Sequence, residues 1–117
     1  MTTQEIADRL TELCRKGDFE TAIKELFAED AISIEPEASH REPTKGLNAI
    51  LEKGKQFDAM VEEVHSSRIS DPIVGGNAIA LSLNMDVTLK GVGHSAMSEI
   101  CVYEVKDGKI ISERFFS

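Results

Sequence analysis

The sequence predicts an α+β fold, a cone-shaped α+β barrel in which three N-terminal helices pack on a strongly curved antiparallel sheet. Apolar residues recur at helical spacing in the first half of the chain. From about residue 59 to the C-terminus they alternate with period two. Helices at one end of a chain and a strand meander at the other indicate helices packed on one face of a sheet. The open end of such a cone forms a ready cavity.

Two helices come first, separated by a tight corner. The residues from Thr2 to Glu5 have the capping-box pattern that begins a helix. The apolar stripe of this helix is Ile6, Leu10, Leu13 and Cys14. Gly17 is a natural helix end, and Asp18 is a natural N-cap for the second helix. The apolar residues of the second helix are Phe19, Ala22, Ile23, Leu26 and Phe27.

Residues 26–36 join the second helix to a short strand. Ile32 and Ile34 indicate this strand, which stops at Glu35 directly before Pro36. Glu35 ends an apolar run and is therefore a candidate pocket residue, and the alternative is a strand-end glutamate exposed to water. After a polar loop, a third helix is predicted with four apolar residues on one side: Leu47, Ile50, Leu51 and Phe57.

Four longer strands are expected after the third helix. They fall at about residues 60–69, 78–89, 94–105 and 109–116, with turn residues between them. Asp107-Gly108, before the last strand, is a strong hairpin signal. The strand at 78–89 is apolar on one side and carries small or polar residues on the other. Such an uncovered face usually needs a partner, so we expect a homodimer.

Length, charge and cysteine content limit the classes of protein to which this chain can belong. The 117 residues are expected to form one domain, residues 1–117. The net charge of −8 repels phosphate backbones and disfavours a nucleic-acid partner. No apolar run approaches the roughly 18 residues of a membrane span, and the N-terminus has no secretion signal. With no membrane partner expected, Cys14 and Cys101 are interpreted as reduced thiols of a cytoplasmic protein.

Four short segments carry a resemblance to a known family. They are Gly17-Asp18-Phe19, Leu-Phe-Ala-Glu-Asp-Ala at 26–31, Gly-Leu-Asn-Ala-Ile at 46–50 and Val-Lys-Asp-Gly-Lys-Ile at 105–110. In this order and spacing, the whole chain resembles the SnoaL-like proteins of the nuclear transport factor 2-like superfamily. The resemblance implies the cone fold. Because the superfamily includes isomerases, cyclases, dehydratases and binding domains, the resemblance does not imply one activity.

The resemblance also suggests catalytic positions. Steroid isomerases of the superfamily place a catalytic aspartate before a proline, and the matching residue here is Glu35. Their two oxyanion donors would fall near Leu10 and Cys101, neither of which can replace them, so steroid isomerisation by that mechanism is not expected. SnoaL-like cyclases use an acidic residue as acid and base, for which Glu99 and Glu113 are the nearby choices.

The direction in which Glu99 and Glu113 point depends on strand register. Glu99 alternates with Ile100, so either Glu99 or Ile100 faces the cavity. A two-residue turn at Asp107-Gly108 pairs residue 105 with 110 and residue 103 with 112. Glu99 and Glu113 would then point to opposite faces. Both line one cavity only if a bulge shifts the register.

The remaining site predictions concern the cavity wall. The predicted lining residues are Leu10, Cys14, Phe57, His65, Met97, Cys101, Tyr103, Glu113 and Phe115. His65 and His94 are candidate proton shuttles. No pair of histidines has metal-ligand spacing, so no metal is expected. Gly91-Val92-Gly93 imitates a dinucleotide fingerprint, but no helix follows it, so no cofactor is expected.

Two functions remain open from the sequence. The first is a small enzyme doing acid/base chemistry on a small hydrophobic organic molecule without a cofactor, with Glu35 or Glu99 as proton carrier. The second is a non-catalytic module that binds a ligand or forms dimers. A closed, largely apolar pocket with one desolvated acid favours the enzyme. A cavity filled by side chains, or acids that all reach water, favours the module.

Overall fold

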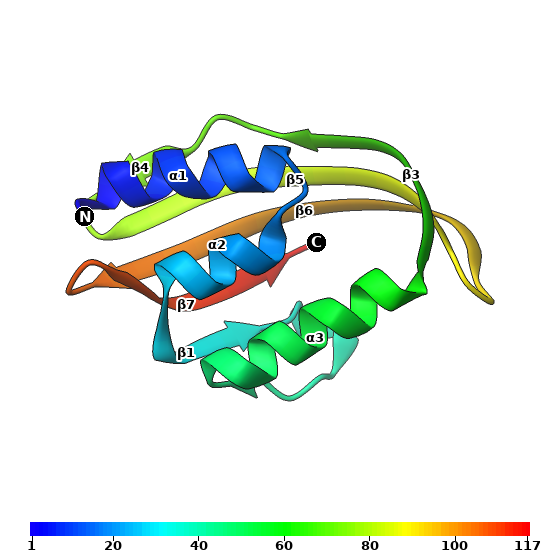
Figure 1. The fold of residues 1–117 in the computed structure, drawn as a ribbon, viewed down its shortest axis with the longest axis horizontal. Helices are drawn as coiled ribbons and strands as arrows, with labels where there is room; N and C mark the ends of the chain where they lie inside the picture. Colours follow the sequence, from blue (N-terminus) through cyan, green and yellow to red (C-terminus); the bar gives the residue numbers. More distant parts are fainter.

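A curved, unclosed sheet of seven strands carries the fold, and three helices cover one of its faces (Figure 1). The computed structural model describes residues 1–117. The helices are α1 (Thr3–Arg15), α2 (Phe19–Leu26) and α3 (Leu47–Met60), with a short 3₁₀ turn, η1 (Glu37–Ser39). The strands are β1 (Phe27–Ile34), β2 (Thr44–Lys45), β3 (Val61–Ile69), β4 (Ile73–Gly75), β5 (Ala78–Leu89), β6 (Gly93–Lys106) and β7 (Lys109–Phe116). The predicted α+β cone is confirmed.

The sheet order is β2-β1-β7-β6-β5-β3, with β4 paired to β5. One pair differs from the predicted antiparallel sheet, because β1 runs parallel to β7. Parallel neighbours need a long connection, and everything from β2 to β6 lies between these two strands in the chain. Strand β1 therefore enters the sheet beside the last strand, which alternation along either strand alone does not reveal.

The helix starts follow the predicted capping. Thr2 and Glu5 form the reciprocal capping box of α1, with N···O distances of 2.8 and 3.1 Å. The Asp18 carboxylate caps α2 by accepting from the Thr21 amide at 3.2 Å. The buried faces of these helices meet the sheet in one hydrophobic core, which includes Ile6, Leu10, Leu26, Ile50, Ile79 and Ile110.

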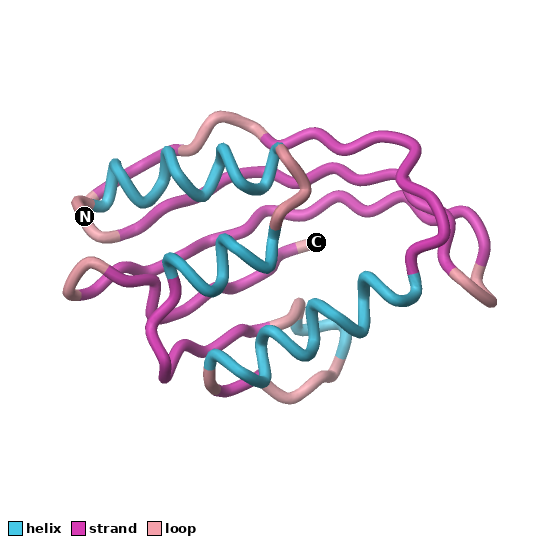
Figure 2. Tube along the Cα trace, in the orientation of Figure 1, coloured by secondary structure: helices cyan, strands magenta, loops and turns pink.

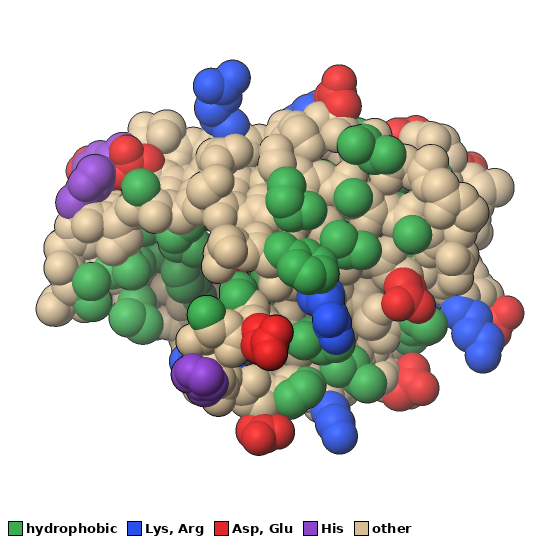
Figure 3. All heavy atoms as spheres, turned by 180° about the vertical axis from the view of Figure 1, so that it is seen from behind, with side chains coloured by type: hydrophobic (Ala, Val, Ile, Leu, Met, Phe, Trp, Pro, Cys, Tyr) green, Lys and Arg blue, Asp and Glu red, His purple; other side chains and the backbone are tan.

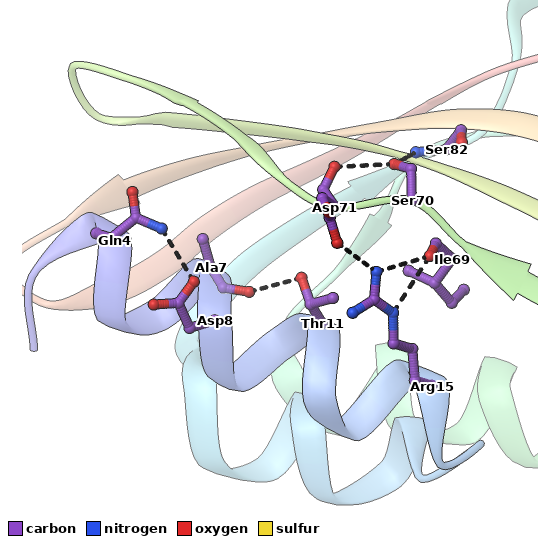
Figure 4. A network of polar contacts seen from close by, with 9 residues as sticks. All are labelled: Gln4, Ala7, Asp8, Thr11, Arg15, Ile69, Ser70, Asp71 and Ser82. Atoms are coloured by element: carbon purple, nitrogen blue, oxygen red, sulfur yellow. Dashed lines mark hydrogen bonds and ion pairs between the residues drawn. The ribbon is translucent and has the colours of Figure 1, made fainter.

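Arg15 ties the end of α1 to the corner after β3 (Figure 4). Its guanidinium donates to the Ile69 carbonyl from Nε at 3.2 Å and from Nη2 at 3.0 Å, and Nη2 also donates to Asp71 at 2.8 Å. Beside this contact, Ser70 and Ser82 exchange backbone and hydroxyl hydrogen bonds. The Arg15 contact holds α1 to the β3–β4 corner, and the Ser70–Ser82 contact holds that corner to β5.

The opposite end of the sheet extends past the helices. Figure 2 shows β5 and β6 running on as a long hairpin whose turn lies at the far end of the molecule, beyond α3. The backbone of α3 leads directly into β3, which pairs with β5 along this extension. None of the helices is both long and apolar enough to cross a membrane.

Candidate functional site

A cavity of about 400 Å³ lies between the helices and the inner face of β5, β6 and β7. It is lined by 25 residues, 15 of them hydrophobic. The apolar side of the wall includes Phe19, Ile23, Leu81, Leu83, Met85 and Met97. Size and lining are those of a small-molecule site. A separate groove beside α1, around Arg15 and Asp71, is lined mainly by polar and charged side chains.

A β-bulge in β7 decides which acids share the cavity. Val105 pairs with Ile110 as predicted, but the register then shifts, and Glu104 pairs with Ser112. The extra residue is Ile111. Tyr103 consequently lies opposite Glu113, so the predicted pairing of 103 with 112 is wrong and the alternative with a bulge holds. Directly opposite residues point to the same face, so Glu113 joins Tyr103 on the inner face.

The inner face of β6 carries Glu99 rather than Ile100. Cys101, Tyr103 and Val105 are buried on that face, whereas Ile100 on the other is 47% exposed. Glu99 and Glu113 therefore both line the cavity.

Glu113 is the most perturbed acid of the cavity. Its side chain is buried, and that burial raises its pKa to about 7 because a charged carboxylate loses its hydration there. The positive charge of Lys53 and a hydrogen bond from Ser33 pull the pKa down, and the negative charges of Glu35 and Glu99 push it up. At neutral pH, Glu113 is thus poised between its acid and its base form.

Glu99 lies near the same acids but nearer to solvent. It is partly buried, and burial raises its pKa, with a further increase from the charge of Glu35 and an opposing effect of Lys53. It makes no hydrogen bond or ion pair within the chain, so its carboxyl group is free to meet a ligand.

Glu35 forms an ion pair with a residue that the sequence analysis did not single out. Lys53 on α3 donates to Glu35 Oε1 at 2.8 Å and to Ser33 Oγ at 2.6 Å. The side chains of Lys53 and Glu35 are only 26% and 18% exposed. The Lys53 ammonium also lies 5.6 Å from the centre of the Phe115 ring. The charge of Glu35 is therefore balanced by a neighbouring cation.

A signal for Lys53 and Ser33 was present in the sequence. Lys53 lies three residues after Ile50 and four before Phe57, which places a lysine on the apolar stripe of the third helix. Ser33 shares its strand face with Ala31, and both are 0% exposed. A cation on an apolar stripe and a hydroxyl on a buried face are the polar groups that need partners.

The buried thiols and the tyrosine line the cavity without being reactive. Burial raises the pKa of Cys14 and of Cys101 to about 12, so both remain thiols at physiological pH. Burial also raises the pKa of Tyr103 well above its ordinary value. The Tyr103 ring packs edge-to-face against Phe27, with 6.4 Å between the ring centres. Together with Phe57, Met97 and Phe115, these side chains form cavity wall.

Two predicted lining residues lie elsewhere. Leu10 is buried in the core beneath α1 and does not line the cavity. His65 is the extra residue of a bulge in β3 and also lies outside the cavity. It contacts Glu63 and Thr88, each at 2.7 Å. Its ring is 5.6 Å from that of His94, which pairs with Asp86.

The histidines therefore do not serve the cavity acids as proton shuttles. No group of three or more histidine, cysteine or acidic residues has a geometry that could hold a metal ion.

Comparison with known proteins identifies relatives of the whole chain. The sequence model of the SnoaL-like domain matches residues 1–117. A solved structure from Mesorhizobium loti is 35% identical, with a TM-score of 0.91 and 100% of both chains covered. It is described as a candidate SnoaL-like polyketide cyclase, with carbohydrate phosphatase as a second description. No curated protein matches the chain.

More distant structures share the fold. A nuclear transport factor 2-like protein of unknown function from Burkholderia pseudomallei is 14% identical, with a TM-score of 0.78, and 100% of this chain and 92% of that chain are covered. IdmH from Streptomyces antibioticus, a candidate polyketide cyclase, is 19% identical, with a TM-score of 0.73 and coverage of 99% and 91%. The fold and its cavity define a protein of the nuclear transport factor 2-like class. Within that class, the chain belongs to the SnoaL-like family.

Proposed function

We propose that this protein is an enzyme that performs acid/base chemistry on a small, largely apolar organic molecule in the cavity, with Glu113 as the proton carrier. The reaction class is that of an isomerase, cyclase or dehydratase. In each of these, a proton is removed beside a carbonyl group and delivered to another atom of the same substrate. This chemistry needs a positioned acid or base and no cofactor.

The burial of Glu113 in the cavity wall is the single observation that carries the proposal. A general acid or base works best when its pKa lies near the working pH, and that of Glu113 is about 7. An acid that is 7% exposed in a mostly apolar cavity also supports the enzyme over the binding module.

The roles of the other two acids follow from their surroundings. Glu99 has no partner in the chain and lines the same cavity, so we assign it as the second acid/base group. Glu35, the residue that matches the isomerase base, contacts Lys53, and we assign it to holding that lysine. The sequence predicted Glu35 and Glu99 as the catalytic residues. In this proposal, Glu113 takes the place of Glu35.

The nature of the substrate is supported by the relative of highest identity named above. The Mesorhizobium loti protein is described as a candidate polyketide cyclase, and polyketides are carbonyl compounds with acidic protons beside the carbonyl. A carbonyl oxygen can accept a hydrogen bond from protonated Glu113 or Glu99. The cavity lining holds five acidic and three basic side chains, an excess of acids that disfavours an anionic group. A neutral carbonyl compound is the substrate class that fits.

We further propose that the protein is a cytoplasmic homodimer. Apolar side chains gather on the sheet face away from the helices (Figure 3). Ile100 and Phe116, which are paired across β6 and β7, are 47% and 49% exposed. Ile73 on β4, which pairs with β5, is 74% exposed. A second copy covering this face would remove these side chains from water.

Proton exchange tests the enzymatic proposal without knowledge of the product. The protein is mixed in D₂O with a panel of cyclic and aromatic ketones, and the loss of the proton beside the carbonyl is followed by ¹H NMR. We expect accelerated exchange of at least one ketone, and a loss of about 10²-fold or more in Glu113→Gln. The matched control is Glu104→Gln, an exposed glutamate of β6.

The outcomes separate the two functions. Exchange that is unaffected by Glu113→Gln and by Glu99→Gln would overturn the acid/base assignment. Ketones that raise the melting temperature but exchange no faster than in buffer would identify a non-catalytic binding module.

A further inference from the structure

Ser33 lies between a cation and the buried acid of the cavity. It is 0% exposed and accepts a hydrogen bond of 2.6 Å from Lys53 Nζ. The parallel pairing of β1 with β7 places Ser33 directly beside Glu113, and hydrogen bonding by the Ser33 hydroxyl is one of the influences that lower the pKa of Glu113. Lys53 is held in turn by Glu35 at 2.8 Å. Direct contacts thus link Glu35, Lys53 and Ser33, and strand pairing places Glu113 next to Ser33.

The chemistry of the donors fixes the direction of each hydrogen bond. An ammonium group has three donors and no acceptor, so Ser33 must accept from Lys53. A hydroxyl group has one proton, and that proton remains free to be donated to Glu113. The Glu113 oxygen that faces Ser33 is therefore held as an acceptor. When Glu113 is protonated, its proton lies on the other carboxyl oxygen.

We propose that Lys53 and Ser33 are positioning residues for the proposed function: they fix the acidic proton of Glu113 on the oxygen that does not face Ser33. Since Glu113 lines the cavity, this leaves the free oxygen and its proton available to a ligand. This assignment extends the acid/base proposal, and the catalytic role of the two residues depends on that proposal. The hydrogen-bond relay itself can be measured without a substrate.

Several other groups act on Glu113 and must be distinguished from the relay. They are Glu35, directly after β1, and Glu99 on β6, whose negative charges raise the pKa of Glu113. The other titratable groups that face Glu113 are Tyr103, Cys14 and Cys101, whose own pKa values its charge raises. Near neutral pH, Lys53 is the nearby positive charge. Removing it would raise the pKa of Glu113 through charge alone, even if Ser33 did not relay the contact. The test therefore has to separate charge from hydrogen bonding.

A double-mutant cycle read out by carboxyl titration makes that separation. Protein labelled with ¹³C-glutamate is titrated, and the Glu113 side-chain signal is identified by its absence in Glu113→Gln. We expect Ser33→Ala and Lys53→Met each to raise the pKa of Glu113 by roughly one pH unit, because each removes a group that stabilises the carboxylate. In the Ser33→Ala background, Lys53→Met should raise it by clearly less than in the wild-type background.

The outcomes decide the proposal. Equal effects of Lys53→Met in both backgrounds would mean that Lys53 acts through charge alone and would overturn the relay. An unchanged pKa in Ser33→Ala would overturn it as well, which keeps the test decisive should Lys53→Met fail to fold. Ser112→Ala, beside Glu113 on the outer face of β7, is the matched control and should leave the titration unchanged. A titration that overturns the relay does not affect the ketone exchange result. An absence of ketone exchange likewise does not affect the titration result.

Discussion

Tyr103 on β6 and Glu113 on β7 lie directly opposite each other, one residue away from the pairing that an unbroken hairpin would give. The single extra residue Ile111 moves Glu113 from the outer face of the sheet to the inner one. This places a carboxyl group where a buried tyrosine and two buried thiols form the wall. The acidity of the cavity, and with it the proposed chemistry, depends on this bulge.

Stability should depend on pH through Glu113. The folded state raises the pKa of this acid from an ordinary 4.5 to about 7. Between those values, the folded state binds more protons than the unfolded state, so the free energy of unfolding falls as pH rises and levels off above about 7. The full difference corresponds to roughly 3 kcal/mol. Urea denaturation at pH 5 and pH 8 measures it.

Glu113→Gln provides the control for this pH dependence. The amide cannot ionise, so the decline between pH 5 and pH 8 should be largely absent, and the variant should be more stable than the wild type at pH 8. A decline of the same size in both proteins would assign the pH dependence to other groups.

The pairing of Glu35 with Lys53 should contribute measurably to stability. The two groups are 2.8 Å apart and mostly shielded from water, so their interaction is weakly screened. A cycle of Glu35→Gln, Lys53→Met and the double variant should give a coupling energy of about 1–2 kcal/mol by denaturation. The exposed pair of Lys24 and Glu20 on α2 is the comparison, with an expected coupling below about 0.5 kcal/mol. Equal couplings would mean that burial of the Glu35 pair has no energetic effect.

The outer face of the sheet should form a dimer in solution. Sedimentation at micromolar concentration is expected to give twice the chain mass of 12.9 kDa. Ile100→Glu would introduce two charges into a two-fold interface and should shift the protein to monomer. Glu104→Gln, which leaves the apolar residues intact, should remain dimeric. A wild-type protein that is monomeric at this concentration would contradict the dimer.

Periodicity predicted the elements well because each depends on neighbours in sequence. The stripe of α1, the capping box at Thr2 and the alternation of β5 all occur as expected. The parallel neighbour of β1 was not predictable, because pairing between β1 and β7 is decided by how the chain closes. Leu10 was misplaced for a related reason. Apolar spacing shows that a helix face is buried but not whether it meets core or cavity.

The site was predictable in part. Glu35, Glu99, Glu113 and Tyr103 were all named as candidates, and all four line the cavity. Which of these acids is assigned as the proton carrier depends on a bulge that the sequence allows but does not specify. Lys53 and Ser33 acquire their roles only from contacts across 18 and 20 residues of sequence. Contacts between residues so far apart in the sequence are set by the fold and cannot be predicted from local sequence patterns.

The titration of Glu113 in the wild-type protein tests the central claim most directly. The side-chain carboxyl carbon of Glu113 is followed by ¹³C NMR from pH 4 to pH 9, with Glu113→Gln to assign the signal. A midpoint near pH 7 is the predicted result and would establish an acid that exchanges protons at neutral pH. A midpoint near the ordinary glutamate value of 4.5 would show a carboxylate that is fully ionised at neutral pH and would contradict the proposed role.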